Sequence, residues 1–245
     1  RLNRLDYILL GGGTLIAGKP AAPFDMFDGW VDWLKAPLGV VGLGIDPFPE
    51  QYWPAVQALL DRVDSFYVRD RASRTFLHDH PKVQVAPDLT FAYPLPVREN
   101  RSGADAAAPV CGVNLRGTPS FDPAPWLEAC SHLPVQLRGV PFSSFDVFDE
   151  GALLRQLDPD SPQRFDAALY GQLDLIIGTA FHAVLFAVQA TVPVIAIEYA
   201  PKVRRFMEDN GLGCYVLAPD EHDKLPKLVA EVLEEQSAIR DELRA

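Results

Sequence analysis

Residues 173–205 read as a strand, a helix and a second strand, and this pattern constrains the fold more than any other part of the chain. The run over residues 173–177 is short, apolar and β-branched, and it ends in a Gly-Thr turn whose threonine, Thr179, can cap a following helix. A helix is expected to begin near Ala180, and residues 192–197 return to a strand pattern. The segment therefore predicts a βαβ unit with parallel strands and a right-handed crossover.

A histidine and a cationic cluster fall where such a unit binds anions. The helix N-terminus of a βαβ unit lies at the carboxyl edge of the sheet, where backbone N–H groups and the helix dipole attract negative charge. His182 falls in the first turn of the expected helix, and Lys202, Arg204 and Arg205 follow the second strand. We expect an anionic small molecule here, with Lys202 as its ligand. The alternatives are a satisfied core position for His182 and a solvated helix face for the two arginines.

Strand and helix patterns alternate along the rest of the chain, which predicts an α/β fold with mostly parallel sheets. The expected strands cover residues 7–10, 40–43, 65–68, 83–85, 110–115 and 135–137. The expected helices cover residues 50–62, 70–77, 124–131 and 163–172.

A stretch with the composition of a linker, residues 93–109, places a domain boundary near residue 100. We expect two Rossmann-like domains, 1–100 and 101–245, facing each other across a cleft. The amphipathic pattern of residues 223–244 predicts a helix that closes the second domain. Because the chain runs almost at once into its first strand, we also expect that an N-terminal part of the first domain is absent.

Charge and cysteine content exclude several classes of function. A formal net charge of −11 disfavours nucleic acid, which requires a broad basic surface. The three cysteines are far apart, so neither a disulfide framework nor a zinc site is expected, and a reducing cytoplasm fits best. No apolar run is long enough to span a bilayer, so we expect at most peripheral membrane contact. The oligomeric state is not readable from these features.

Other motifs carry weaker signals. The Gly11-Gly12-Gly13 run after the first strand allows close backbone approach to a ligand, or is simply a tight turn at a sheet edge. His78 and His80 lack a third ligand nearby, so no metal site is expected. Arg69 and Arg116 each follow a strand, where charges point toward a ligand cleft or form salt bridges.

Taken together, these segments resemble the polysaccharide pyruvyl transferase family. The matching segments are YILLGGGTLI at 7–16, FYVRDRAS at 66–73, PDLTF at 87–91, GVNLR at 112–116, and IGTAFHAVLFA with the VPVIAIEYAPKV that follows it. The last block is the most specific, and the others support it by appearing in the right order. The resemblance runs from residue 7 to about residue 217, and it implies a fold of two domains like that of the GT-B glycosyltransferases.

The resemblance implies transfer of a pyruvyl group from phosphoenolpyruvate, a donor substrate, onto two sugar hydroxyls as a cyclic ketal, with no cofactor and no metal. Such chemistry needs a general acid or base, and His182 is the candidate. Donor binding is expected at Arg116 and Lys202 in the second domain, with Arg69 third. The loop Gly11, Gly12 and Gly13 is expected, together with Asp88, to meet the sugar from the first domain.

One position departs from the family pattern. Members usually carry arginine two residues before the histidine, whereas this chain has Ala180. Another arginine could substitute, the donor could differ, or catalysis could be lost. The alternatives are therefore a glycosyltransferase that uses a nucleotide sugar, and a non-catalytic member. For an active enzyme we expect a cytoplasmic location, or the inner face of the membrane, and an acceptor from exopolysaccharide, capsule or cell-wall synthesis, lipid-linked or not.

Overall fold

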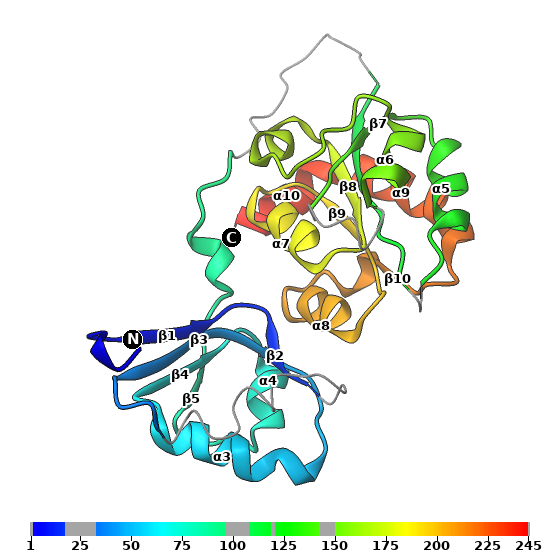
Figure 1. Ribbon diagram of the computed structural model, residues 1–245. Helices are drawn as coiled ribbons and strands as arrows, with labels where there is room; N and C mark the ends of the chain where they lie inside the picture. The colour runs from blue at the N-terminus through cyan, green and yellow to red at the C-terminus, as the bar shows by residue number, and fades with distance from the viewer. Residues whose placement is uncertain (1, 18–32, 97–107, 119–120, 143–149, 245) are drawn as a thin grey trace. The chain divides into compact units, whose positions relative to one another are not determined.

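The computed structural model describes residues 2–17, 33–96, 108–118, 121–142 and 150–244. The chain divides into two compact units, here called the N-terminal unit (Arg1–Tyr93) and the C-terminal unit (Pro94–Ala245). Each unit contains its own parallel sheet with helices packed against it (Figure 1). The α/β prediction is thus confirmed, while the expected boundary at residue 100 lies outside the described residues.

The sheet of the N-terminal unit has the order β1-β3-β4-β5, with β2 paired to β3, and all its pairings are parallel. Its strands are β1 (Ile8–Gly11), β2 (Thr14–Ile16), β3 (Leu38–Ile45), β4 (Ser65–Val68) and β5 (Val83–Val85). Four of these match predicted strands, whereas β2 was not expected because three residues after a glycine run show no period. The helices are α3 (Trp53–Arg62) and α4 (Arg71–Phe76), with short 3-10 turns at Leu2–Arg4, Glu50–Tyr52 and Leu89–Ala92.

Local chemistry fixes how α4 begins in the N-terminal unit. Asp70 is the N-cap residue, and its side chain accepts a hydrogen bond of 2.7 Å from the Ser73 backbone N–H. Ser73 is itself fully buried, and its hydroxyl accepts a hydrogen bond of 2.8 Å from the backbone N–H of Ile45 at the end of β3. The cap therefore joins α4 to the carboxyl end of the neighbouring strand.

The sheet of the C-terminal unit has the order β10-β9-β8-β6-β7 and is also parallel throughout. Its strands are β6 (Val110–Asn114), β7 (Gln136–Gly139), β8 (Leu175–Gly178), β9 (Val194–Ile197) and β10 (Val216–Leu217). Its α-helices are α5 (Ala124–Ser131), α6 (Glu150–Leu157), α7 (Phe181–Gln189), α8 (Pro201–Asp209), α9 (Leu225–Glu234) and α10 (Gln236–Arg244). Short 3-10 segments lie at Ala167–Gln172, Gly213–Tyr215 and His222–Lys224. The predicted βαβ unit is confirmed as β8-α7-β9.

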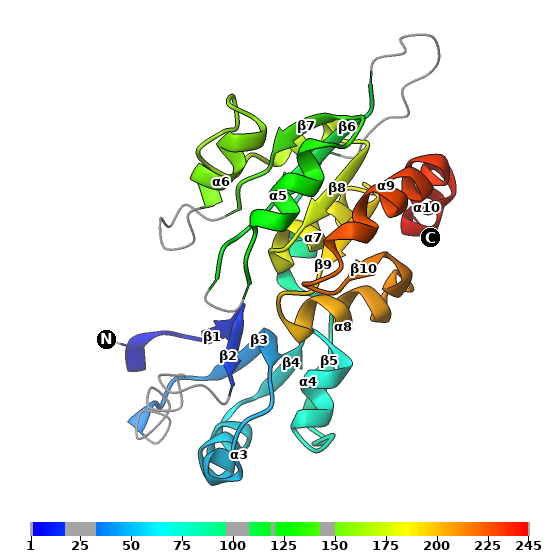
Figure 2. The ribbon, with the colours of Figure 1, turned by 90° about the vertical axis from the view of Figure 1, so that its right-hand side faces the viewer.

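Helices cover both faces of this sheet, as Figure 2 shows. Alternate residues of β8 enter different cores: Ile176 packs with α7 and α8, while Leu175 and Ile177 pack with α5, α6 and α9. Strands that are buried on both faces read as continuous apolar runs, which is why residues 173–177 gave so clear a signal. The C-terminal unit is therefore a doubly wound, Rossmann-like domain.

Two predicted helices differ in the structure. The expected helix at 163–172 is only a 3-10 segment, Ala167–Gln172, because Asp166 caps it late: its side chain accepts a bond of 2.9 Å from the Ala168 N–H. The expected helix at 223–244 is divided into α9 and α10 at Glu235. After this break, the buried Arg240 of α10 pairs with Asp174 at 3.7 Å, a tertiary contact that the helical pattern could not reveal.

No helix in the described part of the chain is long and apolar enough to cross a membrane. The cysteines are all free: Cys111 and Cys130 are buried, and Cys214 is exposed. Burial raises the pKa of the Cys130 thiol to about 12 and raises the pKa of Cys111 well above its usual value. Since the thiolate is the reactive form, the two buried cysteines should be inert.

We expect Cys214 to react rapidly with an aromatic disulfide reagent at pH 8 in the native protein, while Cys111 and Cys130 react only after unfolding. The measurement is the stoichiometry of released chromophore with and without denaturant. In the matched Cys214→Ser variant the rapid phase should disappear. Rapid native-state modification of Cys111 or Cys130 would contradict the packing described here.

Candidate functional site

The carboxyl edge of the C-terminal sheet gathers most of the predicted site residues. Strand β6 lies between β7 and β8, so the chain reverses direction across the sheet at this point, and ligands bind at such switch points in open α/β sheets. Arg116 follows β6, His182 lies in the first turn of α7, and Lys202 lies in the first turn of α8. Because all the strands are parallel, these three side chains belong to the same edge.

The buried side chain of Asn114, at the end of β6, joins four segments of this edge. Its Nδ2 donates to the carbonyl of Val140 after β7 at 2.9 Å and also to the carboxylate of Glu150 at the start of α6. Its Oδ1 accepts from the backbone N–H of Ala180 at 2.9 Å, and its own carbonyl accepts from the Thr179 N–H at 2.9 Å. The N-terminus of α7 is therefore fixed by a residue of a neighbouring strand.

Thr179 does not cap α7, so the prediction for this residue is wrong. The N-cap residue is Ala180, which has no polar side chain, and the Thr179 hydroxyl instead donates to the Asn114 carbonyl at 3.2 Å. The N–H of this N-cap residue donates to Asn114 Oδ1, a contact that the local sequence could not show. The only signal was a polar residue at the end of an otherwise apolar strand.

Glu150 was not predicted as a site residue, yet its carboxylate lies at the centre of this edge. The residue is 1% exposed, and the carboxylate accepts hydrogen bonds from Asn114 Nδ2 and, at 3.2 Å, from the Phe142 backbone N–H. Its second oxygen lies 4.0 Å from Arg116 Nη2. Local sequence offered no signal for this residue, because the residues before it show no helical or strand pattern.

His182 lies among aromatic rings. Its imidazole stacks on Phe142, with ring centroids 5.6 Å apart and planes within 18°, and meets the edge of Phe181 at 5.2 Å. Phe142 in turn contacts Phe165 and Phe186. The imidazole is half-buried, so one face is held by apolar rings while part of the side chain stays accessible.

The cations after β9 divide into two kinds. The Lys202 ammonium lies over the rings of Phe181 at 5.9 Å and Tyr199 at 5.8 Å, and the residue is partly exposed. Arg204 pairs with Glu198 and, at 3.9 Å, with Glu208, as expected for a residue on a helix face. Phe181 thus contacts both His182 and Lys202, which links the two predicted site residues.

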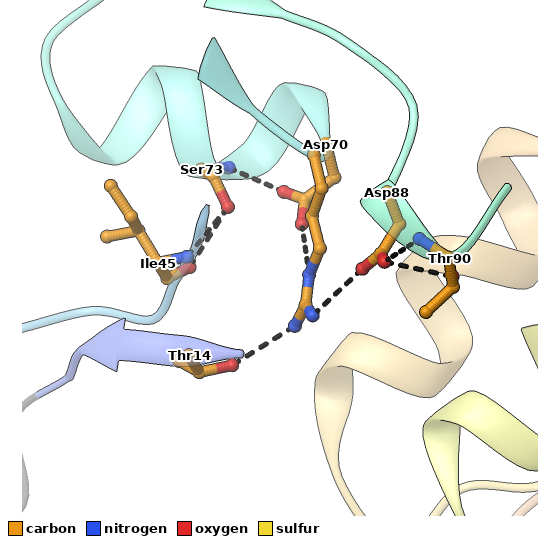
Figure 3. A network of polar contacts seen from close by, with 7 residues as sticks. Thr14, Ile45, Asp70, Ser73, Asp88 and Thr90 are labelled. Carbon is orange, nitrogen blue, oxygen red and sulfur yellow. Dashed lines mark hydrogen bonds and ion pairs between the residues drawn. The ribbon is translucent and has the colours of Figure 1, made fainter. Parts of the chain in front are cut away.

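Arg69 and Asp88 belong to the N-terminal unit and take part in the network of polar contacts that Figure 3 shows. Arg69, directly after β4, has a side chain only 3% exposed, and it donates to Asp88 at 3.2 Å and to the Thr14 hydroxyl at 3.1 Å. It also lies 3.9 Å from Asp70. Arg69 and Asp88, predicted to bind the donor and the acceptor respectively, are therefore partners of each other.

The glycine loop connects β1 to β2 in the same unit. Gly12 and Gly13 have positive φ angles of 79° and 69°, a conformation that side-chain-bearing residues adopt only with strain. The Gly13 carbonyl accepts a hydrogen bond of 2.8 Å from the N–H of Gly44 in β3. The loop is thus a tight turn at the sheet edge, and a Cβ at Gly12 or Gly13 would meet no other atom within 4 Å.

Among the described residues, no three His, Cys, Asp or Glu side chains lie together so that they could hold a metal ion. The site chemistry is instead that of a polarised sheet edge with a histidine, a lysine and a buried arginine–carboxylate pair. Such an edge can hold an anion and exchange a proton with it.

We expect Gly44→Ala to displace Arg69, because a Cβ at this position would lie 2.5 Å from Arg69 Nη2. Overpacking a buried site costs about 1 to 3 kcal/mol, so the free energy of unfolding should fall by about that amount in denaturant titrations.

The control for this substitution is the Arg69→Ala background, in which the clash is absent. There, the further change Gly44→Ala should alter the free energy of unfolding by less than about 0.5 kcal/mol. Equal costs in both backgrounds would show that Arg69 does not pack against Gly44.

We expect Asn114→Ala to lower the free energy of unfolding by about 2 to 4 kcal/mol, because it removes the side-chain acceptor of the Ala180 N–H and one hydrogen-bond donor to the buried Glu150 carboxylate. The matched control is Asn210→Ala, whose exposed amide donates only to the carbonyl of Phe206 in the preceding helical turn. That change should cost less than about 0.5 kcal/mol. Similar losses for the two variants would refute the central role of Asn114.

Comparisons with known proteins agree with this architecture. The family model described as polysaccharide pyruvyl transferase matches residues 1–201. No curated protein sequence gives a significant match.

Solved structures share the fold at low sequence identity. Anabaena HepE, solved in complex with UDP-glucose, is similar with a TM-score of 0.61 and 17% identity over 98% of this chain and 72% of that one. A UDP-N-acetylglucosamine 2-epimerase is similar with a TM-score of 0.58 and 12% identity, over 98% of this chain and 67% of that one. TarM is similar with a TM-score of 0.55 and 12% identity, over 97% of this chain and 51% of that one. The chain therefore spans about half the length of TarM. The chain therefore has the fold of two Rossmann-like domains found in GT-B glycosyltransferases and sugar-nucleotide epimerases.

Proposed function

The chain belongs to the polysaccharide pyruvyl transferase family, and on that premise we propose that it transfers a pyruvyl group from phosphoenolpyruvate to two hydroxyls of a saccharide. The observation that best supports this proposal is the common sheet edge of Arg116, His182 and Lys202 in the C-terminal unit. A small dianionic or trianionic donor needs fixed cations and a proton-transfer group close together, and this edge offers both.

The proposed reaction joins phosphoenolpyruvate to two sugar hydroxyls and releases phosphate. The methylene carbon of phosphoenolpyruvate gains a proton and becomes a methyl group, which leaves cationic character on the adjacent carbon. One sugar hydroxyl attacks that carbon and loses its proton, the carbon–oxygen bond to phosphate breaks, and the second hydroxyl closes the cyclic ketal. Two hydroxyl protons are released in all: one balances the new methyl group and the other leaves with phosphate.

His182 is the proposed general acid and base for these steps. Stacking on Phe142 and the edge contact with Phe181 restrict the ring to few orientations, which favours directed proton transfer. A neutral imidazole can take the proton from an attacking hydroxyl, and an imidazolium can protonate the methylene carbon.

Arg116 and Lys202 are the proposed donor ligands. Arg116 carries a planar fork of N–H donors that suits a carboxylate, whereas the ammonium of Lys202 is a point charge suited to a phosphate. Backbone N–H groups in the first turn of α7 add donors for the anion. Arg69 remains a third candidate from the N-terminal unit, although its pairing with Asp88 and Thr14 favours a structural role.

Ala180 takes the place of the arginine that the family usually carries, and we propose that Arg116 substitutes for it. Strands β6 and β8 are neighbours, so Arg116 and residue 180 follow adjacent strands. The backbone N–H of residue 180 donates to Asn114, a bond that does not depend on the side chain at this position. Only the positive charge of the missing arginine must be supplied by another residue, and Arg116 is the proposed one.

We propose that the acceptor is met by the Gly11 to Gly13 loop and Asp88 of the N-terminal unit. The loop offers unobstructed space at Gly12 and Gly13, and Asp88 is held in place by Arg69 and by the Thr90 N–H and hydroxyl at 3.0 Å and 2.9 Å. An exopolysaccharide, capsule or cell-wall saccharide made on the cytoplasmic side of the membrane, lipid-linked or not, is the proposed acceptor class.

The second candidate function is glycosyl transfer from a nucleotide sugar. The observation in its favour is the fold itself, since Anabaena HepE was solved with UDP-glucose, and a helix N-terminus also suits a diphosphate. Saturable stabilisation by uridine diphosphate, with none by phosphoenolpyruvate, would support this alternative. A third possibility, a non-catalytic family member, predicts no turnover with either donor.

We expect phosphoenolpyruvate to raise the melting temperature of the whole protein saturably, and Arg116→Ala to weaken its affinity about 10- to 100-fold, because a charged hydrogen bond contributes about 1.5 to 3 kcal/mol. His182→Gln should affect binding less but lower phosphate release about 10²- to 10⁴-fold in the presence of acceptor saccharides. Thermal shift, calorimetry and phosphate release measure these effects.

The control is Lys227→Ala, on a side chain of α9 that is 84% exposed, and it should behave as the wild type. No response to phosphoenolpyruvate at millimolar concentration would remove the pyruvyl-donor proposal. Binding that survives Arg116→Ala unchanged would move the donor site away from this sheet edge.

A further inference from the structure

We propose that Glu150 is a positioning residue of the donor site: it orients the Arg116 guanidinium and, through the Phe142 backbone, the ring on which His182 stacks. This inference rests on the proposed function, because Arg116 and His182 are its proposed donor ligand and its acid and base. It extends that function to a buried carboxylate that touches neither donor nor acceptor.

Glu150 makes three contacts with two segments, the end of β6 and the residues after β7. One carboxylate oxygen of Glu150 accepts from Asn114 Nδ2 at the end of β6 and from the Phe142 N–H, the latter at 3.2 Å. The other oxygen lies 4.0 Å from Arg116 Nη2. The carboxylate therefore lies between the arginine and the strand end that carries Phe142.

Burial makes these contacts matter. Glu150 is 1% exposed and the Arg116 side chain 15% exposed, so water screens their interaction weakly. A buried carboxylate persists in its charged form only when hydrogen-bond donors and a cation compensate for lost hydration. Burial raises the pKa of the Tyr170 phenol, and the negative charge of Glu150 raises it further.

The geometry also couples the two proposed functional groups. Phe142 is stacked on His182, and its own backbone N–H is bound by Glu150. Asn114, the other partner of this carboxylate, holds the N-terminus of α7, the helix on which His182 lies. Glu150 thus contacts Arg116, the proposed donor ligand, and also holds the groups that surround His182, the proposed acid and base.

A purely structural role is the competing explanation, and a double-mutant cycle separates the two. Glu150→Gln keeps an oxygen for the Asn114 and Phe142 donors but replaces the charge facing Arg116 with an amide. We expect the melting temperature to change by less than a few degrees, while the dissociation constant for phosphoenolpyruvate rises about 10-fold. In the Arg116→Ala background, the same change should alter that constant less than 2-fold.

The matched control is Glu128→Gln, an exposed carboxylate on α5 of the same unit, which should change neither quantity. An equal effect of Glu150→Gln in both backgrounds would overturn the inference, because Glu150 would then not act through Arg116. No effect on donor affinity in the wild-type background would overturn it as well, and would leave the proposed function standing.

A second measurement does not depend on the donor. In nuclear magnetic resonance spectra, Glu150→Gln should shift the Arg116 Nε–H signal, and Glu150→Ala should also shift the His182 ring protons, whose positions reflect the ring current of Phe142. If the wild type fails to bind phosphoenolpyruvate, the proposed donor is wrong and these shifts decide the inference. Unchanged Arg116 and His182 signals would overturn it even if the donor binds.

Discussion

The buried amide of Asn114 is the interaction on which the rest of the C-terminal edge depends. It accepts from the N-terminus of α7 while donating to Val140 and to Glu150, so it joins β6, β7, α6 and α7. A buried amide needs partners for both its donors and its acceptor, and this arrangement of the segments supplies them. The positions of Arg116 and His182 follow from that arrangement, because each lies within two residues of a segment that Asn114 holds.

The two units use arginine in different ways. Arg69 in the N-terminal unit is packed against Gly44 and bound by Asp88 and Thr14, which holds the loops at its sheet edge together. The side chain of Arg116 in the C-terminal unit is more exposed, at 15%, and its Nη2 lies 4.0 Å from the Glu150 carboxylate. A guanidinium that is almost fully buried joins parts of the fold, whereas one that is partly exposed beside a buried carboxylate can present its N–H donors to a ligand.

Family membership and fold point to two classes of donor, phosphoenolpyruvate and nucleotide sugars. The family indicates a pyruvyl transferase-like enzyme, and the fold is shared with proteins that handle nucleotide sugars. Both donor classes carry phosphate, which a helix N-terminus at a sheet edge can bind. What separates them is the donor's carboxylate, so the ability of Arg116 to replace the charge missing at Ala180 is the central question for this chain.

The sequence alone determined the α/β class, the βαβ unit and the placement of Arg69, Arg116, His182 and Lys202 shortly after strands, because periodicity and chain direction are local properties. It could not determine which side chains meet. Thr179 was expected to cap α7, yet the N-cap residue is Ala180, whose N–H donates to Asn114 of another strand. Glu150 had no local sequence pattern, and Arg69 and Asp88 proved to be partners of each other. Only the tertiary structure decides such contacts, because they join residues distant in sequence whose pairing depends on burial and on the order of the strands.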